Sequence, residues 1–147
     1  MIGGGGERKT LRMVAQYADE SNLIAEARDL PRKLDALGGH CAALGRDRSE
    51  ITVSWQRSTC IAPTMEEAEA DLEAYFAMRG IDLGSLPDDR RAAMTSRFIL
   101  GDPDTVGERL TADLAMGVDG FTLNAPANGH IAGRVTLLGE TAAKVVG

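Results

Sequence analysis

The residues of this chain that are best suited to chemistry are four consecutive glycines, Gly3 to Gly6, followed closely by Arg8 and Thr10. Because glycine has no Cβ, such a run lets the backbone adopt positive φ angles and approach a ligand closely. A helix that begins just after the run presents free N–H groups and the positive end of its dipole. Arg8 adds a cation and Thr10 a hydroxyl, so the pattern predicts a phosphate site. The alternative interpretation is a flexible turn or frayed terminus.

Two well-known phosphate-binding motifs do not fit this run. The dinucleotide-binding fingerprint needs a glycine three positions after Gly5, where this chain has Arg8. A P-loop needs Gly-Lys followed by Ser or Thr, and the residues after Gly6 are different. We therefore predict a phosphate site of another kind.

Other candidate residues stand at the expected ends of strands and in one loop. Asn22 and Asn124 fall where a side chain can bond a ring or substrate, or equally satisfy a loop backbone. His40 and Cys41 are neighbours on a helix and do not face one another, so they are not expected to form a catalytic pair. His130 lies in a loop where it can titrate near neutral pH, although helix capping is the favoured role. No metal site is expected, and the sequence identifies no catalytic residue.

The elements that must position these residues follow from hydrophobic spacing and from helix start and stop signals. Trp55 and Arg57 share one face of the longest strand, and Trp55 is expected to be core. Strands are expected at residues 1–2, 22–25, 51–62 and 121–124, and helices at about 8–18, 29–44, 64–76, 88–97, 102–116 and 131–145.

This order is strand then helix four times over, with one helical insertion before the last strand. Such alternation predicts an α/β fold with a parallel sheet. Four βα units are half of a TIM (β/α)8 barrel, which typically has about 250 residues. A small open doubly wound sheet is the alternative, but a first strand of two residues does not span a sheet. We expect residues 1–147 to form a single domain, one half of a barrel.

Composition excludes several classes of function. A net charge of −6 and the absence of a basic stripe argue against a nucleic-acid surface. No apolar run is long enough for a membrane span, and the N-terminus does not resemble a signal peptide. The two isolated cysteines, Cys41 and Cys60, fit a reducing compartment, so we expect a cytoplasmic protein.

Four short motifs follow one another along the chain: Ile2-Gly3-Gly4-Gly5-Gly6 continuing to Tyr17-Ala18-Asp19; Gly45-Arg46-Asp47 before Ser49-Glu50-Ile51-Thr52-Val53; Phe98-Ile99 with Gly101-Asp102-Pro103; and Gly117-Val118-Asp119-Gly120-Phe121. In this order they resemble the C-terminal half of the luciferase-like monooxygenase family, whose members are flavin- or coenzyme F-420-dependent oxidoreductases. The resemblance covers nearly the whole chain.

The resemblance implies a barrel enzyme that uses FMN or coenzyme F-420 on a small-molecule substrate, and the F-420 branch is the more similar. The family's first four βα units, which supply much of the contact to the flavin ring, have no counterpart here. Combined with the glycine pattern, the resemblance predicts that the cofactor phosphate is held by Gly3, Gly4, Gly5, Gly6, Arg8, Thr10 and Asn22.

A second hypothesis is a non-catalytic half-barrel. A four-stranded parallel sheet is expected to leave two free edges and an exposed apolar face, which is unfavourable unless it is paired. Two copies closing into a homodimer would cover both features with two-fold symmetry. Such a dimer would bind a phosphorylated ligand without turnover. In the first hypothesis the ring pocket is completed by a missing N-terminal half, whether truncated, encoded separately or lost.

Overall fold

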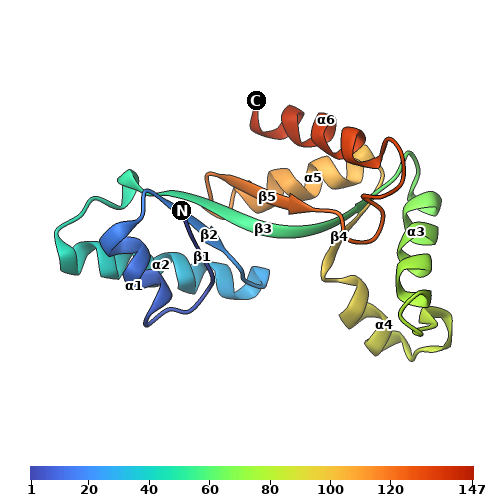
Figure 1. The fold of residues 1–147 in the computed structure, drawn as a ribbon, viewed down its shortest axis with the longest axis horizontal. Coiled ribbons are helices and arrows are strands. Elements are labelled where there is room, and N and C mark those ends of the chain that lie inside the picture. Colours follow the sequence, from blue (N-terminus) through green and yellow to red (C-terminus); the bar gives the residue numbers. More distant parts are fainter. The chain divides into compact units, whose positions relative to one another are not determined.

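The computed structural model describes residues 1–147, in which strands and helices alternate as expected (Figure 1). No helix is long and apolar enough to cross a membrane. Besides three short 3-10 turns, the elements are β1 (Ile2–Gly3), α1 (Thr10–Tyr17), β2 (Glu20–Leu23), α2 (Leu30–Leu44), β3 (Thr52–Ile61), α3 (Met65–Ala77), α4 (Asp88–Thr95), β4 (Phe98–Gly101), α5 (Pro103–Leu114), β5 (Gly120–Asn124) and α6 (Arg134–Val146).

The strands form one five-stranded sheet with the order β1-β2-β3-β4, in which β5 also pairs with β3. The three pairings along this path are parallel, which confirms the α/β class predicted from the alternation. Contacts divide the chain into two compact units: unit 1 is Met1–Gln56 with Ala112–Thr122, and unit 2 is Arg57–Thr111 with Leu123–Gly147. The long strand β3 contributes to both units.

Unit 1 has its core between the sheet and two helices. In α1, Leu11 and Val14 are fully buried, and α1 packs against α2 (Figure 1). Leu37 of α2 and Trp55 of β3 are buried in the same cluster, so the prediction that Trp55 is a core residue is confirmed. The Trp55 indole N–H donates to the carbonyl of Ala25 at 3.0 Å, which satisfies its polar atom.

The Gly45-Arg46-Asp47 motif has a structural explanation in unit 1. Gly45 ends α2 with φ of 68°, a left-handed conformation that glycine adopts easily. The Arg46 guanidinium donates to the carbonyls of Ala15 and Ala18 at 3.2 and 2.8 Å, at the C-terminal end of α1. Asp47 accepts the N–H of Ser49 and thereby caps the 3-10 turn before β3. The motif therefore ends α2, binds the C-terminal end of α1 and caps the turn that leads into β3.

Replacing Arg46 by alanine should lower the free energy of unfolding by about 1–2 kcal/mol, because two carbonyls at the end of α1 lose their charged donor. Chemical denaturation of the purified chain measures this change. Arg28→Ala is the matched control, since Arg28 is exposed and pairs only with the exposed Glu26; about 0.5 kcal/mol or less is expected for it. Equal effects of the two substitutions would contradict a capping role for Arg46.

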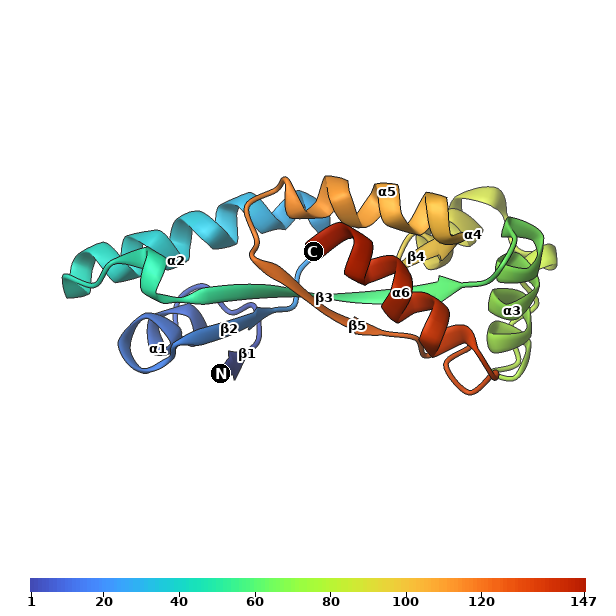
Figure 2. The same ribbon diagram turned by 90° about the horizontal axis from the view of Figure 1, so that it is seen from above.

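Unit 2 has a separate core that includes an aromatic cluster. Cys60 of β3, together with Leu72 and Phe76 of α3, is buried there. The rings of Phe76 and Phe98 meet edge to face at a centroid distance of 6.1 Å, and Tyr75 packs in the same way against both. The helices α5 and α6 are neighbours in both views, and a Cβ on Gly107 of α5 would stand 3.8 Å from Thr141 and 4.0 Å from Val145 of α6 (Figures 1 and 2).

The structure corrects three details of the predicted elements. The insertion before the last strand is not only helical, because Phe98–Gly101 forms the additional strand β4, too short to show a period. The second strand is Glu20–Leu23, shifted toward the N-terminus from the predicted 22–25. The first helix begins at Thr10, not at Arg8, since Glu7 to Lys9 form a turn.

Candidate functional site

The glycine-rich turn begins where β1 ends and lies against the end of β2. Gly4 has φ of 132°, which side chains rarely tolerate, and its N–H donates to the Asn22 carbonyl at 2.9 Å. A Cβ on Gly5 would stand 2.3 Å from the carbonyl oxygen of Ile24. The turn is therefore packed against its neighbour so closely that only glycine fits at Gly5.

One polar side of α2 holds this turn. The Lys33 ammonium group donates a hydrogen bond to the Gly5 carbonyl at 2.5 Å, and His40 Nε2 lies 2.7 Å from the carbonyl oxygen of Glu7. The Glu7 carboxylate bonds Arg32 and lies 3.6 Å from Lys33 Nζ. These α2 residues were not predicted as part of the site. Their spacing along one helix face was visible in the sequence, but the packing of that face on the glycines was not.

The turn leaves backbone donors available. The N–H groups of Gly5 and Gly6 donate to no backbone acceptor, whereas the Gly6 carbonyl receives the N–H of Leu11 at 3.0 Å. The Thr10 hydroxyl oxygen lies 3.0 Å from the point where a Gly6 Cβ would stand. Two amides and a hydroxyl near a lysine ammonium are donors of the kind that bind phosphate oxygens. The predicted residues Gly4, Gly5, Gly6 and Thr10 thus lie together.

Gly3, Asn22 and Ser54 lie side by side in this order on the neighbouring strands β1, β2 and β3. The parallel register places Gly3 opposite Asn22 and Asn22 opposite Ser54, so the three share one face. The Ser54 hydroxyl donates to Asn22 Oδ1 at 3.3 Å. The expectation that the exposed face of the half-barrel is apolar is wrong here. In unit 1 Gly3, Asn22 and Ser54 form a polar row on that face, whereas the buried Ser21 and Leu23 lie on the opposite face of β2.

Arg8 stands apart from this group. It is exposed in the turn before α1, not in the first helical turn as predicted. The reason is local: the N–H of Leu11 bonds back five residues to Gly6, and the helical pattern begins with Met13 bonding to Lys9. The cation that approaches the glycines in the structure is Lys33.

A second polar cluster, in unit 2, joins the end of β3 to the loop after β5. The amide of Asn128, which is fully buried, donates to the Ile61 carbonyl at 2.8 Å and to the Asp71 carboxylate at 2.9 Å. Arg134 bonds Asp71 at 3.0 Å and Glu67 at 2.9 Å. The cluster ties α3 to the last loop and was not predicted, because Asn128 and Asp71 are 57 residues apart.

The cysteines and histidines do not form a reactive group. Burial, and then the charge of Asp71, raises the pKa of the Cys60 thiol from 9.0 to about 12, so it remains protonated and is a poor nucleophile. Cys41 is also buried. His130 is exposed, and the favoured capping role is wrong because Gly133 is the N-cap of α6. No three metal-ligating side chains come together.

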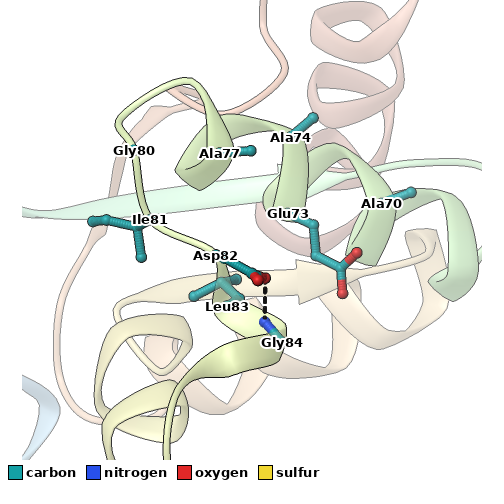
Figure 3. Close-up of a pocket in the computed structure, with 9 residues that line it drawn as sticks. All are labelled: Ala70, Glu73, Ala74, Ala77, Gly80, Ile81, Asp82, Leu83 and Gly84. Carbon is teal, nitrogen blue, oxygen red and sulfur yellow. Dashed lines mark hydrogen bonds between the residues drawn. The ribbon is translucent and has the colours of Figure 1, made fainter.

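One hollow in unit 2 has a volume of about 490 Å³ and involves none of the predicted residues (Figure 3). Ala70, Ala74 and Ala77 of α3 form one wall, and the turn after the helix forms the other. Its charged side chains are Glu73 and Asp82, and the Asp82 carboxylate accepts the N–H of Gly84 at 3.0 Å. Because both charges are negative, this hollow is unsuited to a phosphate group.

No protein-family model matches the sequence, and no curated protein matches it. Solved structures do match. EDTA monooxygenase from a Chelativorans species superposes with a TM-score of 0.71 and 18% identity, over 99% of this chain and 43% of that one. The coenzyme F-420-dependent tetrahydromethanopterin reductase from Methanopyrus kandleri gives 0.67 and 18%, over 97% and 49%. DmoA from Hyphomicrobium sulfonivorans gives 0.62 and 20%, over 90% and 38%.

The fold is luciferase-like. The resemblance predicted from four short motifs is thus confirmed at the level of fold. The chain spans half or less of each of these three enzymes, which agrees with the prediction of a half-barrel. At 20% identity or lower, the luciferase-like fold by itself assigns neither activity nor cofactor to this chain.

Proposed function

We propose that this chain is the C-terminal half of a flavin- or F-420-dependent oxidoreductase, and that it holds the cofactor phosphate at its glycine-rich turn. Two observations support the proposal: the fold matches part of a group of enzymes that includes an F-420-dependent reductase and a monooxygenase solved with FMN, and the turn offers backbone donors beside a lysine. The observation that carries it is the second: the N–H groups of Gly5 and Gly6 have no backbone acceptor and lie beside the Thr10 hydroxyl and the Lys33 ammonium group.

The residues present fit a phosphate group. The amides of Gly5 and Gly6 and the hydroxyl of Thr10 would donate to its oxygens, and Lys33 would supply the positive charge. Asn22, in the polar row beside the turn, would bond the part of the cofactor next to the phosphate. Gly3 and the exposed Arg8 complete the proposed set. Hydride transfer is chemistry that the cofactor supplies, whereas this half of the protein would bind and orient it.

The complete active site is proposed to require the N-terminal half of the barrel as well, since the chain spans no more than half of the enzymes it resembles. That half would contribute the rest of the ring pocket and the substrate contacts. The choice between FMN and F-420 and the identity of the small-molecule substrate depend on those contacts. The single-domain organisation and the cytoplasmic location expected from the sequence stay predictions.

Binding of FMN and riboflavin tests the phosphate site, because the two molecules differ only by the phosphate group. We expect FMN to shift the amide signals of Gly5 and Gly6 in NMR titrations and riboflavin to leave them in place. Lys33→Gln should weaken FMN binding about tenfold, since a charged donor is lost. Lys144→Gln, on the exposed end of α6, is the matched charge control. Equal binding of FMN and riboflavin would refute the proposal.

The alternative is a homodimeric half-barrel that binds a phosphorylated ligand without turnover. One observation favours it: β1 pairs only with β2, so the sheet ends in a free edge that a second copy could extend. A melting temperature that rises with protein concentration would support this alternative. A monomer that stays folded at nanomolar concentration would exclude it.

A further inference from the structure

The glycine-rich turn contains one acidic side chain of its own, Glu7. Its carboxylate bonds the Arg32 guanidinium and lies 3.6 Å from the Lys33 ammonium group. Glu7 and Lys33 are both partly buried, with side-chain exposures of 27% and 13%. An anionic group of the protein therefore already lies against the cations that approach the turn.

The backbone beneath Glu7 is fixed independently of its carboxylate. His40 Nε2 contacts the Glu7 carbonyl at 2.7 Å, and Lys33 donates to the Gly5 carbonyl at 2.5 Å. The carboxylate can therefore rotate away while the turn keeps its conformation. Removing its charge is expected to change the electrostatics of the turn more than its shape.

We propose that the Glu7 carboxylate competes with a bound phosphate group for Arg32 and Lys33, and so limits the affinity of the turn for phosphate. This inference rests on the proposed function, because it concerns the same turn. The physical basis is charge: a phosphate dianion placed near Lys33 is repelled by the Glu7 carboxylate and must share or displace its partners. Glu7 would then act as an internal counter-ion that favours reversible binding.

The test is a titration of the whole chain with inorganic phosphate at low salt, followed by the amide signals of Gly5 and Gly6. Glu7→Gln keeps the size of the side chain and removes its charge, so it should tighten phosphate binding about fivefold. Glu50→Gln is the matched control. It makes the same change in net charge, but Glu50 precedes β3 at the opposite end of the parallel strands from the turn. Its phosphate affinity should equal that of the natural chain.

The tightening by Glu7→Gln should shrink, but not vanish, at high salt, because salt screens the charges of this partly buried turn less than fully exposed ones. Glu7→Ala should change affinity in the same direction, which separates loss of charge from any special effect of glutamine. If the natural chain binds phosphate and both Glu7 variants bind it no more tightly, the counter-ion role is overturned and the proposed function stands. If neither the natural chain nor Glu7→Gln binds phosphate, the proposed function fails and this inference fails with it.

Discussion

Gly5→Ala should lower the free energy of unfolding by about 3 kcal/mol and abolish the binding of phosphate at the turn. The new methyl group would stand 2.3 Å from the Ile24 carbonyl oxygen and 3.2 Å from the Lys33 ammonium nitrogen. The carbonyl is backbone, so it cannot swing aside as a side chain would, and the whole turn must move away from β2. That movement would also displace the amides of Gly5 and Gly6. Chemical denaturation and the FMN titration measure the two effects.

Gly39→Ala is the control for this substitution. Gly39 lies within α2, and a Cβ there meets nothing within 4 Å, so alanine should stabilise the helix by about 0.5–1 kcal/mol. If Gly5→Ala lowers the free energy of unfolding and Gly39→Ala raises it, the close packing of Gly5 on Ile24 is the cause of the difference. A Gly5→Ala protein that is as stable as the natural chain would show that the turn is free to move.

Asn128→Ala should lower the free energy of unfolding by a similar amount, about 3 kcal/mol. The substitution leaves the Ile61 carbonyl without its side-chain donor and removes the amide from the Asp71 carboxylate, in a place where Asn128 is fully buried. Loosening of the cluster should also expose the Cys60 thiol, which lies in the same unit beside α3. Denaturation measures the first effect, and the alkylation rate of Cys60, followed by peptide mass, measures the second.

His130→Ala is the comparison, because His130 is in the same loop but exposed, and its replacement should change stability by less than about 0.5 kcal/mol. Stability of Asn128→Ala equal to that of His130→Ala would mean that the buried cluster contributes nothing. If Asn128→Ala loses stability but Cys60 is alkylated no faster, the packing of Cys60 against α3 is not what the substitution loosens.

Much of the local structure could be predicted because its causes are local. Thr64 accepts the N–H of Glu67 and begins α3, and Asp102 accepts that of Thr105 before Pro103 opens α5. A hydrogen bond across three residues depends only on the residues between its ends. The same holds for Gly45, whose left-handed conformation ends α2. The four-residue strand β4 was missed because it is too short for a period.

The partners of the candidate site could not be predicted because they are distant in the chain. Lys33 reaches Gly5 across 28 residues and His40 reaches Glu7 across 33. Which helix face covers a turn depends on the angle at which the helix packs, and that angle is set by many side chains along the contact. The contact of Lys33 with Gly5 was therefore not predicted, whereas the role of Arg8, which is exposed in the turn before α1, stays a prediction.

The sequence by itself determined the alternation of strands and helices, the glycine run and the order of motifs that points to a luciferase-like fold. Those features are patterns of residue type, and residue type sets backbone freedom and hydrophobic period. Only the tertiary structure decided why Gly5 must be glycine, that a polar row runs from Gly3 through Asn22 to Ser54, and that Glu7 shares the cations of the turn. Each of these depends on atoms from separate elements meeting within a few ångströms, which sequence spacing does not specify.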